Sequence, residues 1–137
     1  MIDEDHLAES GQNIEQEDLF FEISFCKGIL KRNPNFMRAL ILLGDLYTRS
    51  GQYPEGLVID LKLQELSPDD PYILYNLSCS YSLLKQCDKA FLAIQQAIAC
   101  GYQDFEFLEK DKDLMYLRND VRFQEYYEKL KNQMCHE

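Results

Sequence analysis

The chain contains the stretch MRALILLGDLYTRSGQYPEGLVIDLKLQELSPDD at residues 37–70, followed directly by PYILYNLSCSYSLLKQCDKAFLAIQQAIACGYQD at residues 71–104. An offset of 34 positions aligns the two stretches. Residues of the same kind recur at this offset: Pro34 and Pro68, Leu40 and Leu74, Leu43 and Leu77, Gly44 and Ser78, Tyr47 and Tyr81, Gly56 and Ala90. A repeat of this length predicts stacked helical hairpins, because each hairpin can bury its apolar face only against a neighbour.

Turn residues divide these stretches into helices. Gly51 lies where the C-terminal cap of a helix needs a positive φ, and Gly101 closes the second hairpin. Pro71 is suited to open a helix, and Asp88 can cap the next one. We therefore expect helices at about 36–49 and 54–66, then one from residue 71 and another from residue 88.

The segments on either side of the repeats differ from them. Residues 1–16 carry acids and amides with few large apolar residues, which predicts a mobile acidic N-terminal tail or at best a weak helix. Apolar residues at helical spacing predict a helix over 18–31, which ends before Pro34. After Gly101 the repeat is lost, and we expect two short helices at about 104–110 and 111–117. A last helix follows a cap at residues 119–120.

These residues resemble the tetratricopeptide repeat (TPR) family. The first unit supplies Leu40, Leu43, Gly44, Tyr47, Gly51, Tyr53, Gly56, Leu63 and Pro68, and the second supplies Leu74, Leu77, Ser78, Tyr81, Ala90, Ile94 and Ala97. Two residues depart from the pattern. Asp60 replaces a large buried residue, so that its hairpin either packs loosely or pairs the carboxylate, and Tyr102 replaces the usual proline. Residues 107–123 resemble the end segment of small bacterial-type TPR proteins.

The resemblance implies an all-α fold, a right-handed superhelical stack of helix-turn-helix hairpins with short capping helices. Residues 17–137 would form a single TPR domain after the tail. This domain would comprise a half repeat at 17–35, repeats at 37–70 and 71–104, and C-terminal capping helices at 105–133.

The resemblance also implies a concave groove lined by the first helix of each hairpin. The residues expected to line it are Arg38, Ile41, Asp45, Thr48, Tyr72, Tyr75, Asn76, Cys79 and Ser82. Tyr72 and Tyr75 are the best candidates for anchors of a partner, because large amphipathic side chains are typical of interfaces. The alternative is that they cover the terminal helices of the same chain. Some family members clamp a partner's carboxylate, but here only Asn76 matches that clamp. The groove is instead expected to accept an apolar or basic peptide.

The composition argues against several classes of function. The formal net charge is −10 and no cluster of Lys and Arg occurs, which argues against binding to nucleic acid or to an anionic membrane. The five cysteines form no CxxC pair, the N-terminus is acidic, and no apolar run is long enough to span a bilayer. We therefore expect a soluble, cytoplasmic protein.

No catalytic, cofactor or metal site is expected. His6 and His136 lie near the ends of the chain, so neither can form a catalytic pair on a rigid element. Cys135, His136 and Glu137 provide too few ligands for a structural zinc. The favoured hypothesis is therefore a non-enzymatic adaptor for an extended peptide or helix of a partner protein.

Two other hypotheses remain open. One is a dedicated chaperone for a secreted or aggregation-prone protein. The other is a self-associating structural protein, with a homodimer formed through the helix at 18–31, where Phe20 and Phe21 are expected to be exposed. Alternatively, the tail folds back and places Leu7 and Ile14 over this patch.

Overall fold

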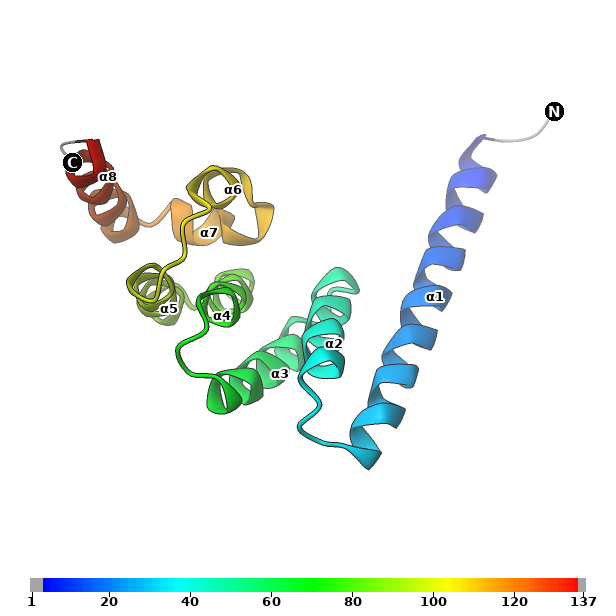
Figure 1. The fold of residues 1–137 in the computed structure, drawn as a ribbon. Coiled ribbons are helices and arrows are strands. Elements are labelled where there is room, and N and C mark those ends of the chain that lie inside the picture. The colour runs from blue at the N-terminus through cyan, green and yellow to red at the C-terminus, as the bar shows by residue number, and fades with distance from the viewer. Residues whose placement is uncertain (1–3, 136–137) are drawn as a thin grey trace. The chain divides into compact units, whose positions relative to one another are not determined.

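The computed structural model describes the backbone of residues 4–135 and the side chains of residues 15–135. Within this part of the chain, eight α-helices and one 3-10 helix follow one another without a strand (Figure 1). The all-α prediction is thus confirmed. The helices belong to two compact units, of which the first ends at Ile59 and the second begins at Asp60. The single domain over residues 17–137 stays a prediction.

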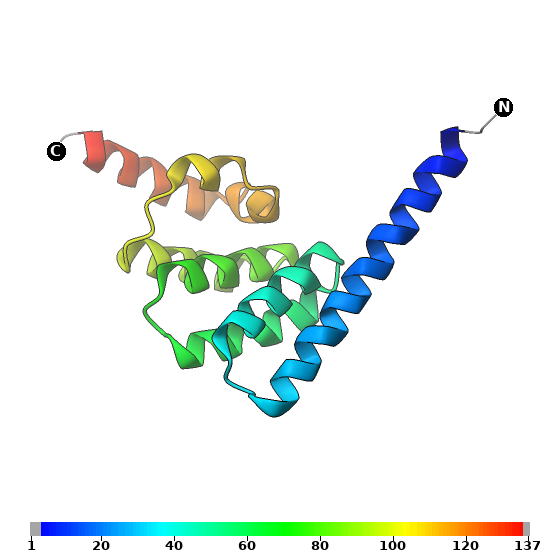
Figure 2. The same ribbon diagram turned by 45° about the vertical axis from the view of Figure 1, so that its right-hand side comes forward.

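The first unit is built on α1 (Glu4–Arg32) and α2 (Met37–Arg49), with the beginning of α3 (Tyr53–Leu66). α1 and α2 run antiparallel, side by side (Figure 2). Their contact buries Ile23 and Cys26 of α1 together with Leu43, Leu46 and Tyr47 of α2. Since α1 has 29 residues and α2 only 13, α1 continues well beyond its neighbour.

The N-terminal boundary of α1 corrects the sequence prediction. The helix begins at Glu4 and not near Asp18, so most of the segment expected to be a mobile tail or a weak helix has a helical backbone. Its Glu, Gln, Ala and Leu residues favour helix even without apolar periodicity, which explains the difference. α1 continues without reversal to Arg32, so the chain does not fold back on itself here. The side chains of Leu7 and Ile14 lie outside the described residues.

The second unit is built on the hairpin of α4 (Pro71–Leu83) and α5 (Cys87–Ala99) (Figure 1). Ser78 is fully buried at the crossing, where its hydroxyl donates a 2.7 Å hydrogen bond to the Ala90 carbonyl. The C-terminal elements follow: α6 (Phe105–Lys110), η1 (Lys112–Leu114), α7 (Met115–Arg118) and α8 (Val121–Cys135). Leu108, Leu114 and Leu117 extend the core of the hairpin and are fully buried.

The turns follow the prediction with one exception. Gly51 and Gly101 have φ angles of 80° and 112°, as a C-terminal cap requires. Asp70 caps α4 by accepting hydrogen bonds from the backbone of Tyr72 and Ile73. Asp88 was expected to cap α5, but α5 begins at Cys87, which places Asp88 inside the first turn.

Gly56 lies where α2 and α3 cross, and the space around it shows how small the residue at this position must be. A Cβ on Gly56 would lie 3.4 Å from the Thr48 hydroxyl oxygen and 3.6 Å from Tyr47 Cβ, which are ordinary contacts. We expect Gly56→Ala to stabilise the protein by about 0.5–1 kcal/mol, because alanine favours helix. Gly56→Leu should overpack the crossing and cost about 1–3 kcal/mol. Urea unfolding of both variants measures this, and a clear loss of stability in the alanine variant would contradict it.

Candidate functional site

The predicted groove residues of the first unit lie along α2. They are Arg38, Ile41, Asp45 and Thr48. Arg38, Ile41 and Asp45 are exposed, and 46% of the Ile41 side chain is accessible to solvent. Asp45 forms an ion pair with Arg49, at 3.0 Å between Oδ2 and Nε, which offsets part of its negative charge. Thr48 is half-buried and donates its hydroxyl proton to the Gly44 carbonyl. Among these four residues, Ile41 is therefore the one apolar side chain between polar ones.

The predicted groove residues of the second unit lie along α4 and divide into two groups. They are Tyr72, Tyr75, Asn76, Cys79 and Ser82. Tyr72 and Asn76 are exposed, and Tyr72 is 68% accessible. Tyr75, Cys79 and Ser82 are buried. Only the exposed pair is available to a partner on this helix.

Tyr75 is held by the C-terminal part of its own chain. Its ring stacks on the ring of Tyr102, with centroids 4.3 Å apart and planes 9° from parallel. Its hydroxyl donates a 2.6 Å hydrogen bond to Asp111 Oδ2. Burial, and then the neighbouring Cys79 and Asp111, raise the pKa of Tyr75 far above its ordinary value. This geometry matches the alternative interpretation, in which Tyr75 covers the terminal helices.

The other two buried residues of the predicted groove, Cys79 and Ser82, also face the C-terminal segment. The Cys79 thiol lies 3.8 Å from Asp111 Oδ2, and the Ser82 hydroxyl accepts a 3.2 Å hydrogen bond from the Leu117 backbone N–H. Burial is the main cause that raises the pKa of Cys79 well above its ordinary value, and Asp111 adds to it. The thiol is therefore protonated and sequestered, which is unsuited to a nucleophile.

Asp60 is a buried acid in α3, with 5% of its surface exposed. The Ser80 hydroxyl of α4 donates a short hydrogen bond to Asp60 Oδ2. Of the two possibilities drawn from the sequence, the structure thus shows a paired carboxylate. Burial raises the pKa of Asp60 to about 6, although the hydrogen bond from Ser80 acts in the opposite direction.

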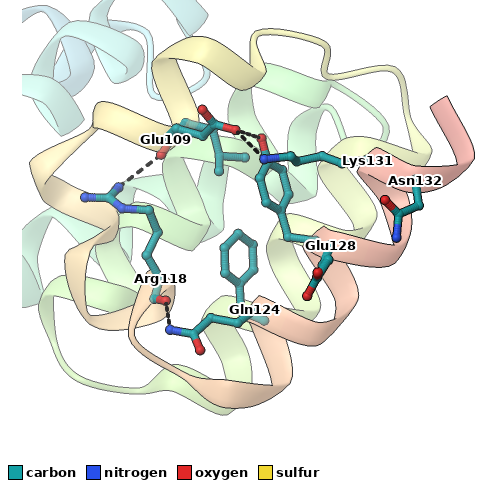
Figure 3. Close-up of a pocket in the computed structure, with 9 residues that line it drawn as sticks. Glu109, Arg118, Gln124, Glu128, Lys131 and Asn132 are labelled. Carbon is teal, nitrogen blue, oxygen red and sulfur yellow. Dashed lines mark hydrogen bonds and ion pairs between the residues drawn. The ribbon is translucent and has the colours of Figure 1, made fainter. Parts of the chain in front are cut away.

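A cleft that the sequence did not predict lies among α6, α7 and α8, with a volume of about 410 Å³ (Figure 3). Leu108, Phe123 and Tyr127 provide its apolar part, and the rings of Phe123 and Tyr127 stack at 5.4 Å. Polar residues line the rest: Glu109, Arg118, Gln124, Glu128, Lys131 and Asn132. The sequence signal for this cleft is the group of aromatic residues Phe123, Tyr126 and Tyr127 in the last helix.

Several polar groups of this cleft bind one another. Glu109 accepts a 2.7 Å hydrogen bond from the Tyr127 hydroxyl, and Lys131 lies 3.5 Å from the same carboxylate oxygen (Figure 3). The Arg118 guanidinium donates to the carbonyls of Leu108 and Asp111. These contacts join α6 and α7 to each other and to α8, so they fasten the C-terminal helices together.

Neither a metal-ligand cluster nor a membrane-spanning helix occurs in the part of the chain that the structure describes. No group of three or more His, Cys, Asp or Glu side chains is arranged to hold a metal ion there. The C-terminal residues His136 and Glu137 lie outside that part. Among the described helices, none combines the length and the apolar character needed to cross a bilayer.

α1 carries an exposed aromatic surface. Phe20, Phe21 and Phe25 are 73%, 70% and 62% accessible, which confirms the expectation that Phe20 and Phe21 are exposed. We call these three residues the aromatic face of α1. A soluble domain seldom exposes three phenylalanines so close together without an interaction that covers them.

Comparisons with known proteins support the fold and leave the function open. No family model matches the chain. A chloroplastic protein from Arabidopsis thaliana is 30% identical over 80 residues, which cover 56% of this chain and 24% of that protein. The chain thus spans about a quarter of the length of this relative. The structure of MamA 41-end from Desulfovibrio magneticus RS-1 matches with a TM-score of 0.60 and 19% identity, over 85% of this chain and 70% of that one. This likeness supports a TPR-like fold, and the fold alone.

Proposed function

We propose that the protein is a non-enzymatic member of the TPR family that binds an extended peptide or a helix of a partner protein. The first helix of each hairpin supplies the contact: Arg38, Ile41 and Asp45 on α2, and Tyr72 and Asn76 on α4. The observation that carries the proposal is the exposure of Ile41 and Tyr72, two large side chains that lie outside both hydrophobic cores. Helices held by a packed core present such side chains at low entropic cost.

The chemistry of the chain supports a protein partner in a reducing compartment. The net charge of −10 disfavours nucleic acid and anionic membranes as partners. All five cysteines are free thiols, which suits the cytoplasm. A catalytic role is disfavoured because the buried Cys79 is protonated and both histidines lie near the chain ends.

The proposal is tested with a peptide selected from a displayed random library against the whole protein. We expect Ile41→Asp and Tyr72→Ala each to weaken binding of the selected peptide about tenfold or more, as a hot-spot residue would. Val58→Ala is the matched control, because Val58 is an exposed apolar residue of α3, on the other helix of its hairpin. Equal losses in all three variants, or no loss in the first two, would refute the assignment to α2 and α4.

Self-association is a second candidate, favoured by the exposed aromatic face of α1. In this case the helix at 18–31 would form a homodimer. A monomeric mass in light scattering at high protein concentration would exclude it.

A further inference from the structure

The face of α1 that points away from α2 combines large and very small residues. Ile23 and Cys26 face α2, while Phe21, Phe25 and Gly28 follow one another on the opposite side at helical spacing. A Cβ placed on Gly28 would meet nothing within 4 Å. Glycine inside a helix weakens the helix, and neither a turn nor a close neighbour requires it here. The absence of a side chain at position 28 is therefore explained best by a contact with another molecule.

The charges of α1 are divided between its two ends. Three acids, Glu15, Glu17 and Asp18, precede the aromatic face, and Glu22 lies within it. Three bases, Lys27, Lys31 and Arg32, follow the aromatic face. Two such helices side by side in parallel would bring acid to acid and base to base. In antiparallel order each acidic end lies beside a basic end, which favours association.

We propose that two copies of this chain pair through this face, with their α1 helices antiparallel about a two-fold axis between Ser24 and Phe25. In this register Phe21 packs over Gly28 of the second copy, and Phe25 meets Phe25 of the second copy on the same flank of the contact. The same register places Glu17 near Lys31 of the second copy and Asp18 near Arg32 of the second copy. One alignment thus places Phe21 over a glycine and acids beside bases, as a self-complementary interface requires.

The inference rests on the self-association candidate and gives its geometry. It involves neither α2 nor α4, so its failure leaves the peptide-binding proposal untouched. Conversely, loss of peptide binding in the Ile41 and Tyr72 variants has no bearing on the α1 pair.

The test is a charge exchange followed by sedimentation velocity of the full chain. The variant Glu17→Lys with Asp18→Lys carries bases at positions 17, 18, 31 and 32, and the variant Lys31→Glu with Arg32→Glu carries acids at all four positions. We expect the wild type to dimerise and each double variant alone to dimerise at least about tenfold more weakly. A mixture of the two double variants should restore dimers of mixed composition, which native mass spectrometry identifies.

A second variant and a control keep the result specific. Gly28→Leu should weaken dimerisation while circular dichroism shows an intact helix, because a side chain at position 28 occupies the space of Phe21 of the second copy. Glu65→Lys with Glu125→Lys makes the same charge change at exposed sites outside α1 and should dimerise as the wild type does. A wild type that stays monomeric at high concentration overturns the proposal. So does a dimer that survives Gly28→Leu and both charge variants, or a mixture that forms no mixed dimer.

Discussion

Tyr75→Ala is expected to lower the free energy of unfolding by about 3–5 kcal/mol, the range for removing a large aromatic side chain from a core. The reason is the position of Tyr75 at the junction of α4 with the C-terminal segment. Its loss removes the stack on Tyr102 and leaves Asp111 without its hydroxyl donor. Chemical denaturation followed by circular dichroism measures the change, and amide hydrogen exchange should show that residues 102–117 open first.

Two other variants separate the causes of this loss. Tyr72→Ala is the matched control, because Tyr72 lies on the same helix, is 68% exposed and meets Tyr102 in an edge-to-face contact with centroids 6.0 Å apart. It should change stability by about 1 kcal/mol. Tyr75→Phe keeps the ring and removes only the hydroxyl group. It should cost about 1.5–3 kcal/mol, the range for losing a hydrogen bond to a charged group, here the half-buried carboxylate of Asp111. Equal stability of Tyr75→Ala and Tyr72→Ala would show that Tyr75 is not buried in solution.

Asp60 is expected to lower the free energy of unfolding of the wild type by about 3 kcal/mol as the pH rises from 4 to 7, and Asp60→Asn should remove this pH dependence. The raised pKa of Asp60, about 6 against an ordinary value of 3.8, means that the folded protein holds this proton more tightly than the unfolded chain. The contribution of Asp60 to stability is therefore fully present below pH 4 and is lost as the pH rises to about 6. Because the asparagine variant has no such group, the difference in stability between the two proteins should shift in its favour as the pH rises.

The measurement is urea unfolding of both proteins across this pH range, together with an NMR titration of the Asp60 carboxyl carbon. Ser80→Ala serves as a second variant, since it removes the hydrogen bond that lowers the pKa of Asp60. In that variant the pKa should rise further, and the loss of stability near neutral pH should grow. A stability difference between wild type and Asp60→Asn that does not vary with pH would refute the assignment.

The sequence predicted the repeat helices well because local signals mark their ends. Gly51, Pro71 and Gly101 define the turns, and α2, α3 and α4 begin and end within about one residue of the predicted positions where a boundary was given. Lys85 has a φ of 61° at the position equivalent to Gly51, so this backbone conformation is kept even without glycine. The start of α1 was missed because helix formation there depends on residue propensity rather than on an apolar pattern.

The candidate site was harder to predict because burial depends on contacts far apart in the chain. The hydrogen bond between Tyr75 and Asp111 joins residues that no repeat period relates. The sequence pattern of α4 alone does not distinguish the burial of Tyr72 from that of Tyr75, and only the path of residues 102–117 decides which of the two is covered. The one local signal for the burial of Tyr75 is Tyr102, which replaces the usual proline of the repeat and can stack on Tyr75.

The way in which the C-terminal segment completes the second core has a consequence for synthesis of the chain. α4 and α5 leave the ribosome before the residues that cover them, namely Tyr102, Leu108, Leu114 and Leu117. During this interval Leu74 and Tyr75 have no partners from that segment, although the hairpin itself is already complete. A nascent chain with exposed apolar residues is prone to aggregation and is a substrate for chaperones. Translation pauses or premature stops between Gly101 and Leu117 should therefore yield fragments that aggregate, whereas residues 102–117 cover this apolar surface once they have been made.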